Sequence, residues 1–189
     1  MSTTDKPRTR NARDTRIRIL KAAQQAFAEM GYSVAGIRHI AAAASVDPAM
    51  VIRYFGSKAG LYEAALVDAV PDYPGFDLSH EKFGERITAK LVEAFLDDRA
   101  LAMIVLSAGD PDAQAISLKV MREQAIGPLV EWLGPPNAEA RATRMIMLLT
   151  GFMFYTRQVP VMSPSDAVES SSADWLACML QDIIDEGSG

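Results

Sequence analysis

The sequence has 189 residues, which is enough for one small and one larger domain, and its net charge is −5. The charge is uneven: residues 1–58 contain ten Lys or Arg against four acidic residues, a net charge of +6, and the remaining residues carry −11. A basic end on an acidic chain predicts a polyanionic partner that binds at that end. We expect a cytoplasmic protein, because the sequence has a single cysteine and no apolar signal segment. We expect no membrane span, because the longest apolar run, residues 145–155, is too short to cross a bilayer.

The first predicted elements are an arm and two helices. Residues 1–14, MSTTDKPRTRNARD, are polar and basic without apolar periodicity, so we expect a disordered arm. The following stretch places Ile17, Leu20 and Phe27 on one face and predicts a helix that ends at Gly31. Residues 37–44 repeat small and apolar side chains at helical spacing and predict a second, shorter helix.

The segment VDPAMVIRYFGSK predicts two helix starts separated by one helix end. Asp47 can cap a helix whose first residue is Pro48, Gly56 ends that helix, and Ser57 can cap the next one. The middle helix, residues 47–54, is too short to be stable by itself, so neighbouring helices must hold it.

A supporting helix, a second helix, a tight turn and a third helix form a helix-turn-helix unit. Such a unit places its last helix in the major groove of DNA. The alternative is a small helical bundle whose short helices only pack against each other. The basic charge of this end favours DNA binding.

A break is predicted in VPDYPGFDLS, residues 70–79, where two prolines and a glycine precede a second domain. Beyond it the apolar spacing predicts helices over residues 79–96, 97–108, 111–133, 137–157 and 165–186, with a kink at Gly127-Pro128. The predicted fold class is all-α. The predicted domains are a basic arm over residues 1–14, a helix-turn-helix domain over residues 15–70 and a larger helical domain over residues 71–189.

The stretches ILKAAQQAFAEMGY and IRHIAAAASVDPAMVIRYFGSKAGLYEAAL resemble the N-terminal domain of the tetracycline-repressor (TetR) family of bacterial transcription regulators. The resemblance covers about residues 15–66. It implies an all-α, dimeric regulator whose C-terminal domain binds a ligand and dimerises. Four positions depart from the family pattern: Ala35 and Gly36 replace a frequent Thr or Ser, Ser45 replaces a frequent turn glycine, and Ile52 replaces a frequent Tyr.

Helical spacing and the resemblance together predict the DNA-contacting residues. Val51 and Phe55 are four residues apart and should face the core, so the opposite side of this helix should face the groove. Arg53 can reach a guanine edge or a phosphate, and Arg38 is a second candidate for a base edge. The full predicted set is Arg38, Pro48, Ala49, Met50, Ile52, Arg53, Tyr54 and Lys58, with Arg8, Arg10 and Arg13 of the arm. An ordinary solvated side chain is the alternative for each of them.

Two further surfaces are predicted in the second domain. Methionine suits adaptable apolar surfaces, and the resemblance implies a ligand pocket, which we expect to be lined by Met103, Leu106, Met121, Trp132, Met145 and Phe152. The resemblance also implies a four-helix dimer interface from the last two helices, with the residues Phe154, Trp175, Leu176, Met179, Leu180, Ile183 and Ile184. Packing within one domain core is the alternative for both sets.

Catalysis and metal binding find little support in the sequence. His39, His80 and Cys178 do not make a recognisable metal site, and the Cys178 thiol is expected to be buried. We therefore expect no enzyme activity and no cofactor. The resulting hypothesis is a homodimeric transcriptional repressor that binds a palindromic operator and is released by a small, mostly apolar ligand. The alternative is a helical dimeric ligand-binding or interaction protein with weak or lost DNA binding.

Overall fold

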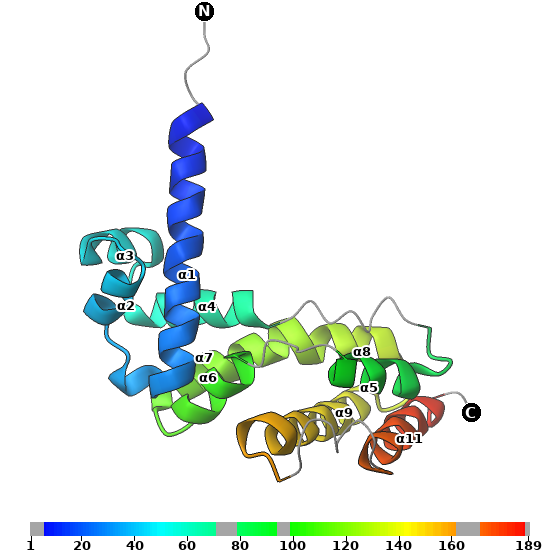
Figure 1. The fold of residues 1–189 in the computed structure, drawn as a ribbon. Helices are drawn as coiled ribbons and strands as arrows, with labels where there is room; N and C mark the ends of the chain where they lie inside the picture. The colour runs from blue at the N-terminus through cyan, green and yellow to red at the C-terminus, as the bar shows by residue number, and fades with distance from the viewer. Residues whose placement is uncertain (1–5, 71–78, 94–98, 162–170, 188–189) are drawn as a thin grey trace, which may run out of the picture. The chain divides into compact units, whose positions relative to one another are not determined.

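The computed structural model describes residues 6–70, 79–93, 99–161 and 171–187 (Figure 1). Within these ranges the regular elements are helices and none is a strand, which confirms the predicted all-α class. Contacts between residues divide the chain into two compact units. Unit 1 contains residues 1–70 and 99–120, and unit 2 contains residues 71–98 and 121–189.

Unit 1 has a single apolar core to which all of its helices contribute. These helices are α1 (Lys6–Val34), α2 (Ile37–Ala43), α3 (Pro48–Phe55), α4 (Lys58–Ala69), α6 (Arg99–Ser107) and α7 (Pro111–Met121). Phe27 of α1, Val51 of α3 and Leu61 of α4 are fully buried in this core. Because α3 has only eight residues, these tertiary contacts supply the stability that so short a helix lacks.

The two ends of α1 differ in how well the sequence predicts them. α1 begins at Lys6, so the predicted disordered arm is wrong for residues 6–14, while residues 1–5 lie outside the described residues. Once a helix has formed, each further residue adds a hydrogen bond at low cost, and the periodicity of apolar residues does not report this extension. The other end is confirmed, because Gly31 has a φ of 73° and interrupts the helical backbone.

Unit 1 does not end at the predicted domain boundary, residue 70. The hydroxyl of the buried Tyr62, on α4, donates a hydrogen bond to the carbonyl oxygen of Met103 at 3.3 Å and lies 3.0 Å from the Ser117 hydroxyl. These contacts join α6 and α7 to the helix-turn-helix segment. Residues 99–120 therefore pack with the N-terminal residues in unit 1. The predicted domain boundary at residue 70 is not a boundary of packing, and it stays a prediction about function.

Unit 2 has its own core, which contains Phe83, Leu129, Met145 and Leu180. Its helices are α5 (Phe83–Glu93), α8 (Gly127–Leu133), α9 (Ala138–Met153) and α11 (Ser171–Asp185), with two π-helical segments, η1 (Arg122–Ile126) and η2 (Phe154–Gln158). The helix predicted over residues 111–133 is divided before Gly127-Pro128: η1 ends at Ile126 and α8 begins at Gly127, and the nitrogen of Pro128 cannot donate a helical hydrogen bond.

Arg141, on α9, is the largest fully buried side chain among the described residues and has a relative exposure of 1%. Its guanidinium donates hydrogen bonds to backbone carbonyls, with Nε 3.0 Å from Pro136, Nη2 3.1 Å from Leu133 and close to Gly134, and Nη1 3.3 Å from Ile184. These carbonyls include the ends of α8 and α11, where helices carry partial negative charge. One buried cation therefore stabilises two helix ends.

Candidate nucleic-acid interface

The ends of α3 are set by local contacts that the sequence predicts. The Asp47 carboxylate accepts a hydrogen bond from the backbone N–H of Ala49 at 2.8 Å, and Pro48 occupies the first turn. Gly56 follows the helix with a φ of 75°, and the Ser57 hydroxyl then accepts a hydrogen bond from the first turn of α4 at 3.0 Å. Both predicted caps are confirmed. They determine which side chains of α3 are directed outward.

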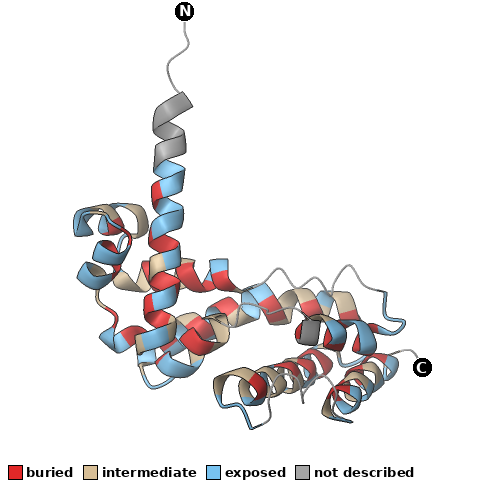
Figure 2. Cartoon of the chain, in the orientation of Figure 1, coloured by how far each residue is buried: buried red, intermediate tan, exposed pale blue. Residues whose placement is uncertain are grey.

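α3 has one buried side and one exposed side (Figure 2). Val51 is fully buried, and Phe55 and Tyr54 are half-buried against the core of unit 1. The exposed side carries Pro48, Ala49, Ile52 and Arg53, and Met50 is half-buried. One cation among small and apolar side chains suits close approach to bases, including contact with thymine methyl groups.

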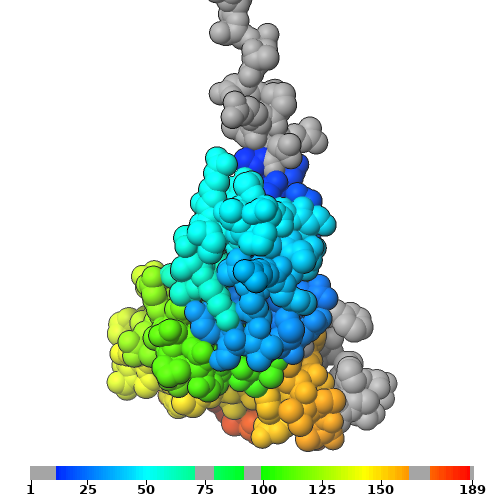
Figure 3. Space-filling view, turned by 90° about the vertical axis from the view of Figure 1, so that its left-hand side faces the viewer, coloured from blue at the N-terminus to red at the C-terminus, as the bar shows by residue number. Residues whose placement is uncertain are grey.

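α2 presents a second exposed cation beside α3. Arg38 is exposed, whereas Ile40 is fully buried. In space-filling view, the segment from α2 to α4 forms one continuous surface (Figure 3). Gly36 is the N-cap of α2 and provides no side-chain hydrogen bond, and Ala35 is buried. The departure from Thr or Ser at these positions therefore leaves α2 without a side-chain cap.

The turn between α2 and α3 needs a left-handed backbone at Ser45, whose φ is 53°. The N–H of Ser45 donates to the carbonyl oxygen of Ala42 at 3.0 Å, which closes the turn. Glycine adopts this conformation at the lowest cost. Serine thus keeps the turn of the helix-turn-helix unit, but at an energetic cost.

Lys58 lies at the start of α4, next to the end of α1. Its ammonium donates a hydrogen bond to the carbonyl oxygen of Ser33 at 3.3 Å and lies 4.6 Å from the centroid of the Tyr32 ring. The ring face attracts the cation. These two contacts hold the ammonium in place, and the Lys58 side chain is only half-buried, so part of it stays accessible to solvent.

Asp110 joins this group from outside the predicted helix-turn-helix segment. Its carboxylate accepts hydrogen bonds from the Ser33 hydroxyl at 2.8 Å and from the N–H groups of Asp112 and Ala113 at 3.1 Å. The hydrogen bonds from Ala113 and Ser33 hold the pKa of Asp110 below its ordinary value, with a contribution from the charge of Lys58. The sequence signals only a helix cap here, because the link to Ser33 spans 77 residues.

The basic residues of α1 extend the candidate interface. Arg13 is exposed, and the side chains of Arg8 and Arg10 lie outside the described ones. Arg16 is also exposed, with its guanidinium carbon 5.5 Å from the ring centroid of Phe55 at the end of α3. Arg16 is not among the residues predicted from the sequence, because only the folded chain brings it next to α3.

The residues predicted to line a ligand pocket are divided between the two units. In unit 1, Met103 is fully buried in the core and Leu106 is 51% exposed. In unit 2, Met145 is fully buried in the core, and the half-buried members are Met121, Trp132 and Phe152. Composition does not distinguish two cores, so the predicted set combines residues of both. The four residues of unit 2 stay candidates.

The apolar side of α11 packs within its own chain. Four residues predicted to form a dimer interface are at most 6% exposed and belong to the core of unit 2: Leu176, Leu180, Ile183 and Ile184. The prediction is wrong for these four. Helical periodicity identifies an apolar face, but it does not say whether the face packs against the same chain or a partner.

The other side of α11 lies at the surface of unit 2. Trp175 is 53% exposed, and Met179 and, on η2, Phe154 are half-buried. Cys178 is exposed, which corrects the expectation of a buried thiol. Cys178 lies between residues of the apolar stripe of α11 in the sequence, but its side chain lies on another side of the helix.

The capped third helix, its exposed side and the surrounding cations define unit 1 as a helix-turn-helix DNA-binding module. Family models match both parts of the chain. Residues 19–65 match the bacterial regulatory proteins of the tetR family, and residues 81–184 match the tetracyclin repressor-like C-terminal domain. The chain therefore belongs to the TetR family. It is a transcription regulator with an N-terminal DNA-binding domain and a C-terminal ligand-binding domain.

Solved structures show the same fold at low sequence identity. GusR of Salmonella enterica is 20% identical, with 97% of this chain and 100% of that chain covered and a TM-score of 0.71. The regulator SCO0857 of Streptomyces coelicolor A3 is 22% identical (97% and 99% covered, TM-score 0.56). NalD of Pseudomonas aeruginosa is 18% identical (89% and 96% covered, TM-score 0.61). No curated protein matches the chain. Among the described helices, none is long and apolar enough to span a membrane.

Proposed function

We propose that this regulator is a repressor in the bacterial cytoplasm, which binds a palindromic operator as a homodimer and leaves it when a small, mostly apolar ligand binds. The observation that carries the proposal is the exposed side of α3, fixed by buried Val51 and by two helix caps. NalD, which has the same fold, is described as the secondary repressor of the MexAB-OprM multidrug efflux pump. This supports repression as the direction of control.

Selection of bound duplexes from a random DNA pool tests the proposed function. We expect a palindromic consensus whose affinity falls steeply with salt, because bound phosphates release counterions. Arg53→Ala should cost about 1–3 kcal/mol on that site and relax one position of each half-site, whereas Lys58→Ala should weaken all sequences alike. Arg86→Ala, which removes an exposed arginine of α5 in unit 2, is the control. Recovery of no consensus would favour the alternative, a ligand-binding or interaction protein that has lost DNA binding.

The homodimer is proposed to form through the exposed sides of α9 and α11. Met147 is 66% exposed and Trp175 is 53% exposed, and such large apolar side chains at a surface favour an interface. Replacing both with Asp should give folded monomers in sedimentation that lose specific binding, because one protomer engages only one half-site. Ile183→Asp should unfold unit 2 instead, since Ile183 is a core residue. A double variant that stays dimeric would place the interface elsewhere.

The ligand is proposed to bind in unit 2, among Met121, Trp132, Met145 and Phe152. Both tryptophans of the chain, Trp132 and Trp175, belong to this unit, so their fluorescence on heating reports its unfolding. A screen of small apolar compounds should find some that raise the melting temperature, because they bind the folded state only. At least one of them should also lower operator affinity. Stabilising compounds that leave operator affinity unchanged would contradict the switch.

A further inference from the structure

α1 is longer than the packing of unit 1 requires. Among the described side chains of α1, which start at Ala12, the first buried ones are Thr15 and Ile19, while Ala12, Arg13 and Asp14 are all exposed. The helix nevertheless starts at Lys6, and its first turns project past α3 (Figure 1). The core of unit 1 therefore does not account for this part of α1.

The projecting part of α1 is strongly basic. Residues 6–18 contain six Lys or Arg and one acidic residue. Arg13, Arg16 and Arg18, the cations of this part whose side chains the structure describes, do not belong to the salt bridges Lys119–Glu63 and Arg144–Glu186. Like charges three or four residues apart on a helix repel each other and destabilise it. A polyanion bound along this part would remove that repulsion.

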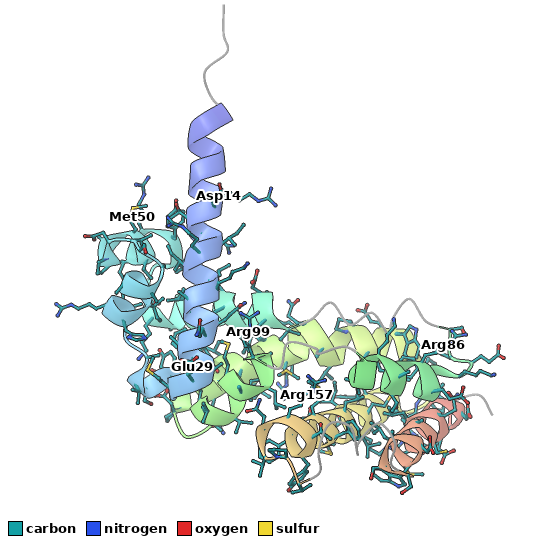
Figure 4. The ribbon with its side chains drawn as sticks, in the orientation of Figure 1. Asp14, Glu29, Met50, Arg86, Arg99 and Arg157 are labelled. Carbon is teal, nitrogen blue, oxygen red and sulfur yellow. The ribbon has the colours of Figure 1, made fainter. Side chains whose placement is uncertain are left out.

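Arg16 connects the basic part of α1 to the reading helix. Its guanidinium carbon lies 5.5 Å from the centroid of the ring of Phe55, the last residue of α3. A guanidinium over a ring keeps its N–H donors available for a phosphate. Asp14 on α1 lies level with Met50 on α3 (Figure 4). DNA that contacts the exposed side of α3 therefore passes close to this part of α1.

We propose that Arg13 and Arg16 form a second DNA-contact surface, which binds backbone phosphates outside the base pairs that α3 reads. Arg13 precedes Arg16 by three residues, so the two side chains are neighbours on the helix surface. Since the helix is continuous with the core of unit 1, the two cations keep a defined position relative to α3. The inference rests on the proposed DNA binding and adds to it the length of duplex that each protomer contacts.

Arg18 provides a matched control within the same helix. It is exposed and carries the same charge, but it lies two residues after Arg16, about 200° around the helix, and so on the opposite side. A general effect of positive charge would make Arg16→Ala and Arg18→Ala equivalent. A defined contact surface would make them different.

The test compares two duplexes with the same selected half-sites, one with long flanks and one trimmed at the outer edges of the half-sites. Fluorescence anisotropy at several salt concentrations gives the affinity and the salt slope of each variant. Wild type should bind the long duplex more tightly and with the steeper slope. Arg13→Ala and Arg16→Ala should lower the slope on the long duplex by about 1 for each phosphate that is no longer bound, and should match wild type on the trimmed duplex. Arg16→Lys should keep part of the slope, and Arg18→Ala should behave as wild type on both.

Two results would overturn the inference. One is an equal effect of Arg16→Ala and Arg18→Ala on both duplexes. The other is a loss with Arg16→Ala that is as large on the trimmed duplex as on the long one, since this would mean that Arg16 only supports Phe55 and α3. Failure of the proposed function gives a different result, in which wild type itself prefers no duplex, and the inference then falls with it.

Discussion

Arg141→Met should destabilise unit 2 by about 3 kcal/mol, because it removes a buried cation that donates hydrogen bonds to four backbone carbonyls. Hydrogen bonds to charged groups contribute about 1.5–3 kcal/mol each, a net value that already includes the loss of hydrogen bonds to water. The four bonds share one guanidinium and are not independent, so the expected loss corresponds to about one or two of them and not to their sum. Methionine fills most of the volume, but it leaves all four carbonyl oxygens, those of Leu133, Gly134, Pro136 and Ile184, without this donor.

Urea unfolding followed by tryptophan fluorescence measures this effect, since both tryptophans belong to unit 2. The protein concentration must be held constant, because association also changes apparent stability. In thermal unfolding, the same destabilisation should lower the melting temperature by about 6–12 °C for a chain of this length. Arg141→Lys should fall between wild type and Arg141→Met, because one ammonium cannot reach all four carbonyls.

Arg144→Met is the matched control for Arg141→Met. Arg144 follows Arg141 by three residues on α9, is exposed, and pairs with Glu186 at the surface, with Nη1 and Oε1 2.9 Å apart. Exposed ion pairs contribute little to stability, so the unfolding midpoint should barely change. The reasoning is refuted if Arg141→Met shifts the midpoint no more than Arg144→Met does.

Three further predictions concern unit 1 and are measured by circular dichroism. Ser45→Gly should stabilise the protein by about 0.5–1 kcal/mol, because glycine adopts the left-handed backbone at this position without the strain of serine. Ala42→Gly on the neighbouring helix should instead destabilise it by about 1 kcal/mol. Stability changes of the same sign in both variants would contradict this reasoning. The pKa of Asp110 in the folded protein lies below its ordinary value of 3.8, so its contribution to stability is present above pH 3.8 and is lost as the pH falls through the folded pKa. Asp110→Asn should therefore make stability depend less on pH in this acid range. An unchanged dependence of stability on pH in this variant would argue against the role of Asp110. Gly31→Ala should cost more than about 1 kcal/mol, because φ is 73° and the new Cβ would lie 2.6 Å from a carbonyl oxygen of α6, so an unaltered melting temperature would disprove the close approach.

The sequence determines the helix-turn-helix segment well, because short-range chemistry sets it. Asp47 and Ser57 cap their own first turns, Gly31 and Gly56 adopt left-handed backbones, and each of these effects acts within a few residues. The buried side of α3 was also predictable, because Val51 faces the core through helical periodicity alone. The family pattern then assigned DNA binding to the other side.

Only the tertiary structure decides what each apolar or charged side chain faces. The stripe of α11 predicts that Leu176 and Ile183 are buried, but their partner is the core of their own unit. Met103 and Met145 look alike in the sequence and belong to different cores. From the sequence, Arg141 cannot be distinguished from an ordinary helical arginine, because one of its acceptors, the carbonyl oxygen of Ile184, is 43 residues away. Capping and periodicity act locally along the chain, whereas burial and hydrogen bonding depend on which distant segments pack together, and periodicity does not encode that choice.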